Sequence, residues 1–291
     1  MLNVTIPNGS LEPFIVKLFE EADLPIRRAS DRDYTATIDD PRFSKVKFLR
    51  PQEIPRAITS GHFDLGICGV HSVHEAQAEI VEVMDLGAGG RAGGKVRIVL
   101  ALPGSRGIAI PDQLPSGLRV STEFPNIARD YFEKRGLRAE ITFSHGATEA
   151  KIPELADAIV ELTETGSSIR RAGFLIVDVL LVSSLKLIAN IDAYAQPEKR
   201  RAIEAIVTLL SGVMQARGKV LLKMNVPADR LEAVIALLPA MKAPTVSQLF
   251  QSNYYAVETV AVKSQVNLLI PELKGLGAED ILELPISKIV A

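Results

Sequence analysis

The stretch ADAIVELTETGSSI, residues 156–169, combines two carboxylates with a turn rich in hydroxyl groups. Its apolar residues predict a buried strand, with Asp157 and Glu161 at the two ends. Buried carboxylates are costly unless they are paired or liganded. The turn that follows offers hydroxyls and successive backbone N–H groups, and a helix beginning at Ile169 would direct its positive end to the same place. The residues of this predicted phosphate-binding turn are Thr165, Gly166, Ser167 and Ser168.

A ligand with a phosphate at one end and a diol at the other would suit both features, because ribose hydroxyls donate hydrogen bonds to carboxylates. A ribose 5-phosphate has this form. We therefore expect Asp157 and Glu161 to bind the ribose, and residues 165–168 to bind the phosphate. A solvated loop with a serine-rich helix cap is the alternative that this segment leaves open.

Arg50 is a second candidate for phosphate binding. It ends the predicted strand 45–50, immediately before a predicted helix that opens with Pro51. In α/β proteins, ligands bind at the carboxyl edge of the sheet, which is where this arginine would lie. A surface salt bridge is the alternative.

Other suggestive residues lack the context that their chemistry needs. The glycine-rich stretch 89–95 matches part of a nucleotide P-loop, but Val96 replaces the Ser or Thr that would hold magnesium, and a strand follows it. His71 and His74 have the spacing of a helical metal site without a third ligand nearby, so we expect surface, capping or packing roles. Cys68 lies in an apolar strand and is expected to be an inert thiol. We predict no metal site built from protein ligands.

The composition excludes several classes of protein. Of the 291 residues, 47% are hydrophobic, and 33 basic residues against 35 acidic ones give a net charge of −2. This balance provides no excess of positive charge for nucleic acid or an anionic membrane. A single cysteine excludes an internal disulfide. With no apolar leader, and with Asp178 and Lys186 interrupting the most apolar stretch, we expect a cytoplasmic protein without a membrane span.

The pattern of the first 217 residues indicates α/β architecture. Short β-rich runs alternate with amphipathic helical runs, which predicts βαβ units and largely parallel sheets. We expect two lobes with a cleft between them. The first lobe comprises residues 1–97 and 188–217, and the second comprises residues 98–187 and carries the phosphate-binding turn.

Residues 218–291 have a different pattern. The predicted strands are 220–227, 245–250, 256–263 and 281–287, and the predicted helices are 228–239 and 265–277. The order βαββαβ predicts a ferredoxin-like domain. Pro271 lies inside the second predicted helix and lacks a backbone donor, so a kink or a late helix start is expected there.

Taken together, these segments resemble those of the ATP phosphoribosyltransferase family in its long form. The resemblance covers essentially the whole chain, in the family's order, and it rests on FLRPQEIPRAITSGHFDLGICG, RVSTEFPNIARDYFEKRGL, LADAIVELTETGSSIRRAGF, GVMQARGKVLLKMNVP, LLPAMKAPTVSQL and LKGLGAEDILELPISKIV. It implies a catalytic core of two lobes like a periplasmic binding protein, followed by an ACT-like regulatory domain. The chain departs from the family's frequent residues at Asn8 and Ser10, at Ser167 to Ile169 and at His71.

The resemblance also implies ligands and residue roles. The turn would hold the 5-phosphate of phosphoribosyl pyrophosphate, while Gly9 and Arg50 would meet pyrophosphate or the phosphates of ATP. Histidine would act as feedback inhibitor at Asn225, Met241 and Thr245. Mg²⁺ would be the cofactor, carried largely by pyrophosphate. The implied assembly is a homo-oligomer, from dimer to hexamer, without a separate regulatory subunit.

The implied reaction joins N1 of ATP to C1 of the ribose and expels pyrophosphate. N1 of adenine already has a free lone pair, so attack requires no catalytic base. This agrees with the absence of a Ser-His-Asp or Cys-His pattern in the sequence. A non-catalytic two-lobed sensor of small molecules and a phosphoribosyltransferase acting on another base are the alternatives, since a fold alone does not fix a function.

Overall fold

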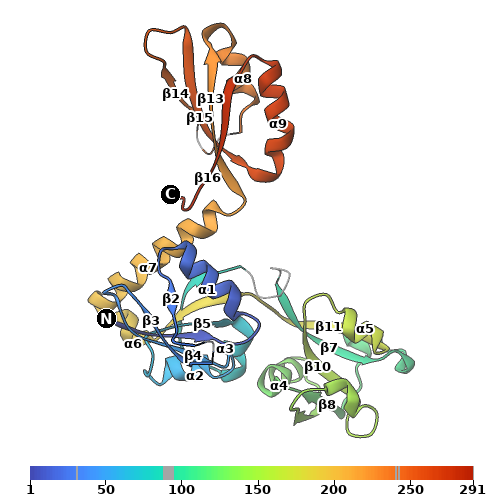
Figure 1. Ribbon diagram of the computed structural model, residues 1–291. Coiled ribbons are helices and arrows are strands. Elements are labelled where there is room, and N and C mark those ends of the chain that lie inside the picture. The colour runs from blue at the N-terminus through green and yellow to red at the C-terminus, as the bar shows by residue number, and fades with distance from the viewer. Residues whose placement is uncertain (31, 88–94, 240, 242, 291) are drawn as a thin grey trace. The chain divides into compact units, whose positions relative to one another are not determined.

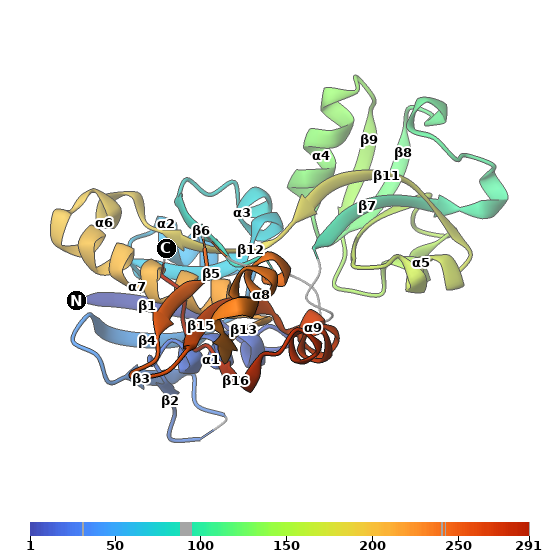
Figure 2. The ribbon, with the colours of Figure 1, turned by 90° about the horizontal axis from the view of Figure 1, so that it is seen from above.

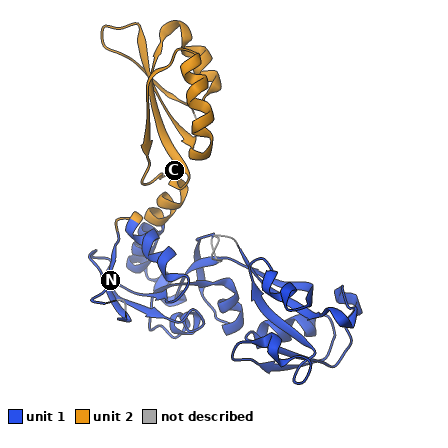
Figure 3. Cartoon of the chain, turned by 45° about the vertical axis from the view of Figure 1, so that its right-hand side comes forward, with its two compact units in different colours: residues 1–20, 24–207 blue, residues 21–23, 208–291 orange. Residues whose placement is uncertain are grey.

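The computed structural model describes residues 1–30, 32–87, 95–239, 241 and 243–290. The chain forms two compact units, shown in different colours in Figure 3. The N-terminal unit comprises residues 1–20 and 24–207, and the C-terminal unit comprises residues 21–23 and 208–291.

The first lobe of the N-terminal unit is built on a seven-stranded sheet in the order β2-β3-β4-β1-β5-β12-β6 (Figure 1). Its strands are β1 (Leu2–Pro7), β2 (Ile26–Arg27), β3 (Thr35–Ile38), β4 (Phe43–Leu49), β5 (Leu65–Gly69), β6 (Val81–Asp85) and β12 (Leu185–Ala189). The helices that accompany them are α1 (Glu12–Glu21), α2 (Ile54–Thr59), α3 (Val70–Ala76), α6 (Ile191–Ala195) and the first part of α7 (Pro197–Ala216). Residues 208–216 of α7 and the last residue of α1 belong to the C-terminal unit. Strand β1 is parallel to both β4 and β5, so the carboxyl ends of these three strands meet at one edge.

The second lobe is built on a five-stranded sheet in the order β11-β7-β10-β8-β9. Its strands are β7 (Val96–Pro103), β8 (Leu118–Thr122), β9 (Ala139–Phe143), β10 (Ala158–Thr163) and β11 (Phe174–Ser183), and its α-helices are α4 (Pro125–Lys134) and α5 (Ser167–Arg171). Helices α4 and α5 cover opposite faces of the sheet (Figure 2), because Phe132 and Ile169 belong to separate hydrophobic clusters. The predicted α/β architecture with two lobes is confirmed.

The sheets place the boundaries between the lobes a few residues away from those expected. Strand β7 begins at Val96, so residues 96 and 97 belong to the second lobe. Strand β12 begins at Leu185, so residues 185–187 belong to the first. The sequence shows one apolar run here, because β11 and β12 are separated by Ser184 alone. Helix α2 also begins at Ile54 rather than Pro51.

The C-terminal unit has the predicted ferredoxin-like topology. Its four strands are β13 (Lys219–Pro227), β14 (Thr245–Gln248), β15 (Tyr254–Val262) and β16 (Glu279–Pro285), which form an antiparallel sheet in the order β14-β15-β13-β16. Helices α8 (Leu231–Leu237) and α9 (Lys263–Gly275) cover one face of this sheet (Figure 1). Helix α9 continues through Pro271, so the expected late start is wrong; the proline is exposed.

Two sequence expectations concern other parts of the chain. Within the described residues, no helix combines the length and the apolar character needed to cross a bilayer. The glycine-rich stretch 89–95 lies outside the described residues except for Lys95, and the strand β7 follows it as expected.

Candidate active site

The predicted phosphate-binding turn connects β10 to α5. Helix α5 begins at Ser167, two residues earlier than expected, and Gly166 is its N-cap. Gly166 has a φ of +75°, a conformation that side chains other than glycine rarely adopt. A Cβ atom at this position would lie 2.7 Å from Ile176 Cδ1 and 2.9 Å from Arg170 Nη1. The turn therefore requires glycine for its backbone conformation and for space.

Hydrogen bonds hold the turn in shape and leave donors available. The N–H of Gly166 donates to Thr163 Oγ1 at 2.9 Å, and the Arg170 guanidinium donates to the carbonyl of Thr165 at 2.7 Å. Among the described residues, the backbone N–H groups of Ser168 and Ile169 have no acceptor. The side chains of Thr165, Ser167 and Ser168 are exposed. A preformed turn with free N–H and hydroxyl donors is suited to bind an anion.

A cavity of about 270 Å³ lies beside this turn. Ser168 and three carboxylates, those of Glu123, Glu149 and Glu161, contribute to its wall. Thr148 donates a hydrogen bond to Glu161, whose other oxygen accepts from the N–H of Leu162 at 3.0 Å. Burial raises the pKa of Glu161, and the two neighbouring glutamates raise it further. We call this space the acidic cavity, and it provides acceptors for ligand hydroxyls next to the anion-binding turn.

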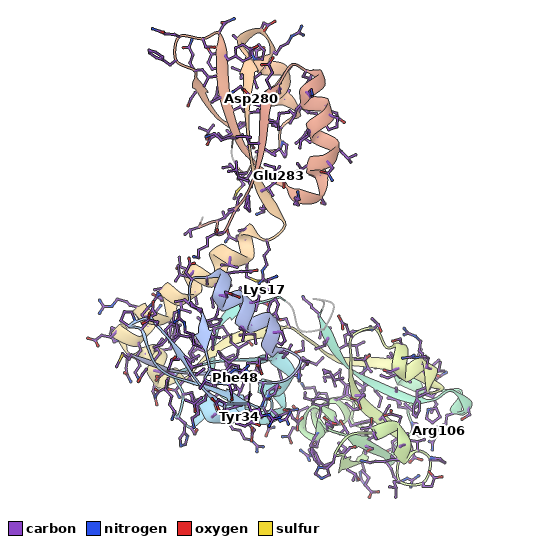
Figure 4. The ribbon with its side chains drawn as sticks, viewed as in Figure 1. Lys17, Tyr34, Phe48, Arg106, Asp280 and Glu283 are labelled. Atoms are coloured by element: carbon purple, nitrogen blue, oxygen red, sulfur yellow. The ribbon has the colours of Figure 1, made fainter. Side chains whose placement is uncertain are left out.

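Asp157 does not line the acidic cavity. It precedes β10, four residues before Glu161, so that about 13 Å of strand separates the two residues. The Arg119 guanidinium binds both of its oxygens, at 3.0 and 3.1 Å, and Arg106 (labelled in Figure 4) also pairs with it. The hydrogen bonds from Arg119 lower the pKa of Asp157 far below its usual value. Of the two carboxylates predicted to bind the ribose, only Glu161 lines the acidic cavity, while arginines hold Asp157 just before the start of β10.

A larger space of about 1150 Å³ lies between elements of the two lobes of the N-terminal unit. Arg50 and Arg56 line it from the first lobe, and neither guanidinium has an acidic partner among the described residues. Glu123 lines both this space and the acidic cavity, which makes the two neighbours. We call the larger space the cationic cleft after these two arginines; the carboxylates of Glu53, Glu75 and Glu123 also line it.

Gly9 lies at the same sheet edge as Arg50. Pro7 of β1 is in register with Leu49 of β4, and the N–H of Asn8 donates to the Leu49 carbonyl at 2.9 Å. Gly9 has a φ of +86° and begins the turn into α1. The two residues predicted to meet pyrophosphate or ATP are thus brought together by the parallel pairing of their strands.

His71 is mostly buried, which corrects the expectation of a surface position and agrees with a packing role. Its Nδ1 lies 2.8 Å from Ser183 Oγ, and its ring makes an edge contact with Phe124. Burial lowers its pKa to about 4, so the side chain is neutral near pH 7. Among the described residues, no group of three or more potential metal-binding side chains includes His71 or His74. Cys68 is buried with its pKa raised to about 12, as expected for an inert thiol.

Two residues that line these spaces, Glu123 and Arg56, and one that bonds Glu161, Thr148, were not predicted from the sequence. Glu123 follows β8, Thr148 comes from a short 3₁₀ turn, and Arg56 lies within α2. Glu123 stands at the carboxyl end of a parallel strand, a position whose significance could have been read from the strand pattern. Thr148 and Arg56 belong to no local sequence motif. Their roles depend on tertiary contacts, because Thr148 bonds Glu161 of β10 and Arg56 lines the cleft between the lobes.

Two of the residues proposed for histidine lie on one face of the C-terminal sheet. The side chains of Met224 and Val226 are buried beneath the helices, so Asn225 points to the opposite face. Asn225 donates to Asp280 (labelled in Figure 4) at 2.8 Å. Thr245 pairs with Glu258, which pairs with Lys223, and this register places Thr245 on the same face as Asn225. Met241, before β14, is 53% exposed.

Comparisons with known proteins identify the relatives of this arrangement. The model of the family described as ATP phosphoribosyltransferase matches residues 50–212, a stretch that contains Arg50, the acidic cavity and the turn. The chain belongs to the ATP phosphoribosyltransferase family. The model described as the HisG C-terminal domain matches residues 216–288, so this member has the long form of the family.

Individual relatives agree over the whole length. An ATP phosphoribosyltransferase of Desulforudis audaxviator is 43% identical over 289 residues, covering 99% of each chain. One of Solibacter usitatus is 43% identical over 290 residues, covering 100% of this chain and 99% of its own. Among solved structures, a chain of the HisG:HisZ ATP phosphoribosyl transferase complex of Thermotoga maritima has 26% identity and a TM-score of 0.63, covering 74% of this chain and 99% of that chain. The chain is accordingly an ATP phosphoribosyltransferase enzyme rather than a non-catalytic sensor.

Proposed function

We propose that the chain transfers the 5-phosphoribosyl group of phosphoribosyl pyrophosphate to N1 of ATP, with release of pyrophosphate. The observation that carries this proposal is the adjacency of two complementary spaces through Glu123. The acidic cavity offers acceptors for ribose hydroxyls beside an anion-binding turn. The cationic cleft next to it offers Arg50 and Arg56 to polyphosphates.

In this proposal the turn Thr165 to Ser168 holds the 5-phosphate, and Glu161 accepts hydrogen bonds from the ribose hydroxyls. Glu161 also supplies negative charge near C1 when the ribose becomes positively charged in the transition state. Asp157 contributes indirectly, because its bonds to Arg106 and Arg119 fix the start of β10. Thr148 orients Glu161 through the hydrogen bond described above.

We place pyrophosphate and the phosphates of ATP in the cationic cleft, near Arg50 and the turn at Gly9. One guanidinium group can donate two parallel hydrogen bonds to two oxygens of a phosphate. This arrangement suits pyrophosphate, which gains negative charge as it leaves. Within the described residues no cluster of acidic, histidine or cysteine side chains could hold a metal by itself. We therefore propose that Mg²⁺ enters on pyrophosphate and keeps most of its ligands from phosphate and water.

No protein base is needed in this mechanism. Adenine N1 attacks with its own lone pair, and catalysis rests on holding N1 in line with C1 and on stabilising the separating charges. His71 is neutral near pH 7 but bonds Ser183 and lies outside the lining of both spaces. We assign it a packing role at the junction of β11 and α3.

We further propose that histidine inhibits this enzyme by binding to the C-terminal unit at Asn225, Met241 and Thr245. The family's C-terminal domain and the common sheet face of Asn225 and Thr245 support this assignment. With its own regulatory unit, the chain would act as a cytoplasmic homo-oligomer, from dimer to hexamer, without a separate regulatory subunit.

The direct test is the reaction itself. The purified chain is incubated with ATP, Mg²⁺ and phosphoribosyl pyrophosphate, and the ultraviolet absorbance is followed, because ribosylation at N1 alters the adenine chromophore. Parallel reactions replace ATP with nicotinate, guanine or free adenine. Absorbance change with ATP alone supports the proposal, whereas pyrophosphate release with another base and none with ATP contradicts it.

A further inference from the structure

The start of helix α4 faces the cationic cleft without a capping side chain of its own. Phe124 is the N-cap and gives no side-chain hydrogen bond, and Pro125 has no N–H. The two N–H groups that follow, those of Asn126 and Ile127, both donate to the carboxylate of Glu75 at 3.1 Å. Glu75 belongs to α3 of the first lobe, which lies beside α4 (Figure 2). A carboxylate from another element thus occupies the positive end of α4.

Ser72 supplies a second observation at the same place. It lies one turn before Glu75 on α3, and both residues line the cationic cleft. Ser72 is 4% exposed, and its hydroxyl has no hydrogen-bond partner among the described residues. A buried hydroxyl without a hydrogen-bond partner is costly. In the wall of a cleft, such a hydroxyl can donate a hydrogen bond to a ligand.

Charges of both signs line the cleft around Glu75, where Glu53 and Glu123 are the other carboxylates. Arg50 and Arg56 line the same cleft and have no acidic partner among the described residues. The cleft, at about 1150 Å³, has room for a polyphosphate in addition to the Glu75 side chain. The donors at this point, two backbone N–H groups and a hydroxyl, are those that phosphate-binding helix ends use.

We propose that the start of α4 together with Ser72 is a phosphate subsite that Glu75 fills when no ligand is bound, and that a terminal phosphate of a polyphosphate displaces this carboxylate. Glu75 then competes with the ligand inside its own cleft. Displacement frees the carboxylate from the backbone of α4, so ligand binding exchanges its hydrogen bonds to Asn126 and Ile127 for bonds to phosphate; the Asn126 side chain bonds the Glu75 carbonyl separately. This inference rests on the proposed function for the identity of the polyphosphate, but not for the presence of the subsite.

If Glu75 competes with the ligand, removing its charge should strengthen pyrophosphate binding. A purely structural cap would not have this effect. Inorganic pyrophosphate is titrated into the full-length protein by calorimetry, for the natural chain and for Glu75→Gln. The glutamine keeps the shape and a weaker acceptor but loses the charge, so we expect pyrophosphate to bind about fivefold to tenfold more tightly. Weaker or unchanged binding in Glu75→Gln overturns the proposal, because a cap that merely orders the cleft would then be the only role of Glu75.

A matched variant separates competition from general electrostatics. Glu53 also lines the cleft but caps its own turn by accepting from the N–H of Arg50 at 3.2 Å. Glu53→Gln removes the same charge, and we expect pyrophosphate affinity to change less than about threefold. An equal gain in both variants refutes competition at α4. Ser72→Ala should weaken binding in both the natural and Glu75→Gln backgrounds, and unchanged binding would remove Ser72 from the subsite.

Localisation uses a readout that is independent of turnover. In Glu75→Gln, the backbone amide resonances of Asn126 and Ile127 should shift when pyrophosphate is added, and absence of these shifts places the anion elsewhere and refutes the subsite. The outcome is separable from that of the proposed function, which fails when no N1 product forms. The pyrophosphate test can succeed or fail whether or not the N1 product forms, so the two results are independent.

Discussion

Replacing Gly166 by alanine should disable the phosphate-binding turn while leaving the rest of the fold in place. Two effects add. A side chain at φ +75° costs about 1–2 kcal/mol of backbone strain. The new Cβ would also lie closer to Ile176 and Arg170 than the 3.4 Å at which ordinary contact begins, and such overpacking costs about 1–3 kcal/mol. The free energy of unfolding should fall by about 2–5 kcal/mol.

Gly61 provides the matched control for this substitution. Its φ is +74°, and a Cβ there would meet nothing within 4 Å. Gly61→Ala should therefore lose only the strain of about 1–2 kcal/mol and keep its activity. Chemical denaturation measures both costs, and steady-state kinetics measures kcat/KM for phosphoribosyl pyrophosphate.

Activity separates the two variants more sharply than stability does. Arg170 holds the Thr165 carbonyl, so displacing this guanidinium moves the turn, and misplacement by about 1 Å can cost about 100-fold in rate. We expect kcat/KM to fall by about that factor in Gly166→Ala and by less than about twofold in Gly61→Ala. Equal kcat/KM in the two variants would show that the turn does not hold the substrate.

Four further predictions concern His71, Asp157 and the C-terminal unit. His71→Asn should change the single-turnover rate by less than about tenfold, or ~1.4 kcal/mol; a thousandfold loss with substrate binding retained would require His71 in the chemistry. Because burial lowers the folded-state pKa of His71 to about 4, the natural chain should lose up to about 3 kcal/mol of stability as pH falls from 6.5 towards 4, and denaturation of His71→Asn should lack this loss. Asp157→Asn should lower Tm and leave kcat/KM within about tenfold, since it breaks pairs with Arg106 and Arg119; an unchanged Tm with a large rise in KM would return Asp157 to the ligand site. Deleting residues 219–291 should abolish inhibition by histidine in kinetic assays, and a folded truncated chain that still responds would place the inhibitor elsewhere.

Features governed by neighbours in the chain could be predicted from the sequence. The turn at Gly166 was identified because glycine, hydroxyl residues and a following helix are local signals, and the structure departs from the expectation only in the start of α5. The ferredoxin-like order of the C-terminal unit followed from apolar periodicity, which strands and helices keep whatever they pack against. The position of Arg50 at the carboxyl edge of its sheet followed from its place between a predicted strand and a predicted helix, whereas its nearness to Gly9 came from the pairing of β1 with β4.

Contacts between distant segments were decided only by the tertiary structure. Asp157 and Glu161 are similar in sequence context, yet the pairing of β10 with β8 brings Arg119 to the first, while the turn at Thr148 reaches the second. The cap that Glu75 gives to α4 joins residues about fifty positions apart, and no local pattern signals it. His71 is buried because Ser183 and Phe124 arrive from other elements. Periodicity and turn chemistry depend on bonds along the chain, whereas the charge and solvation of a side chain depend on which segments fold against it.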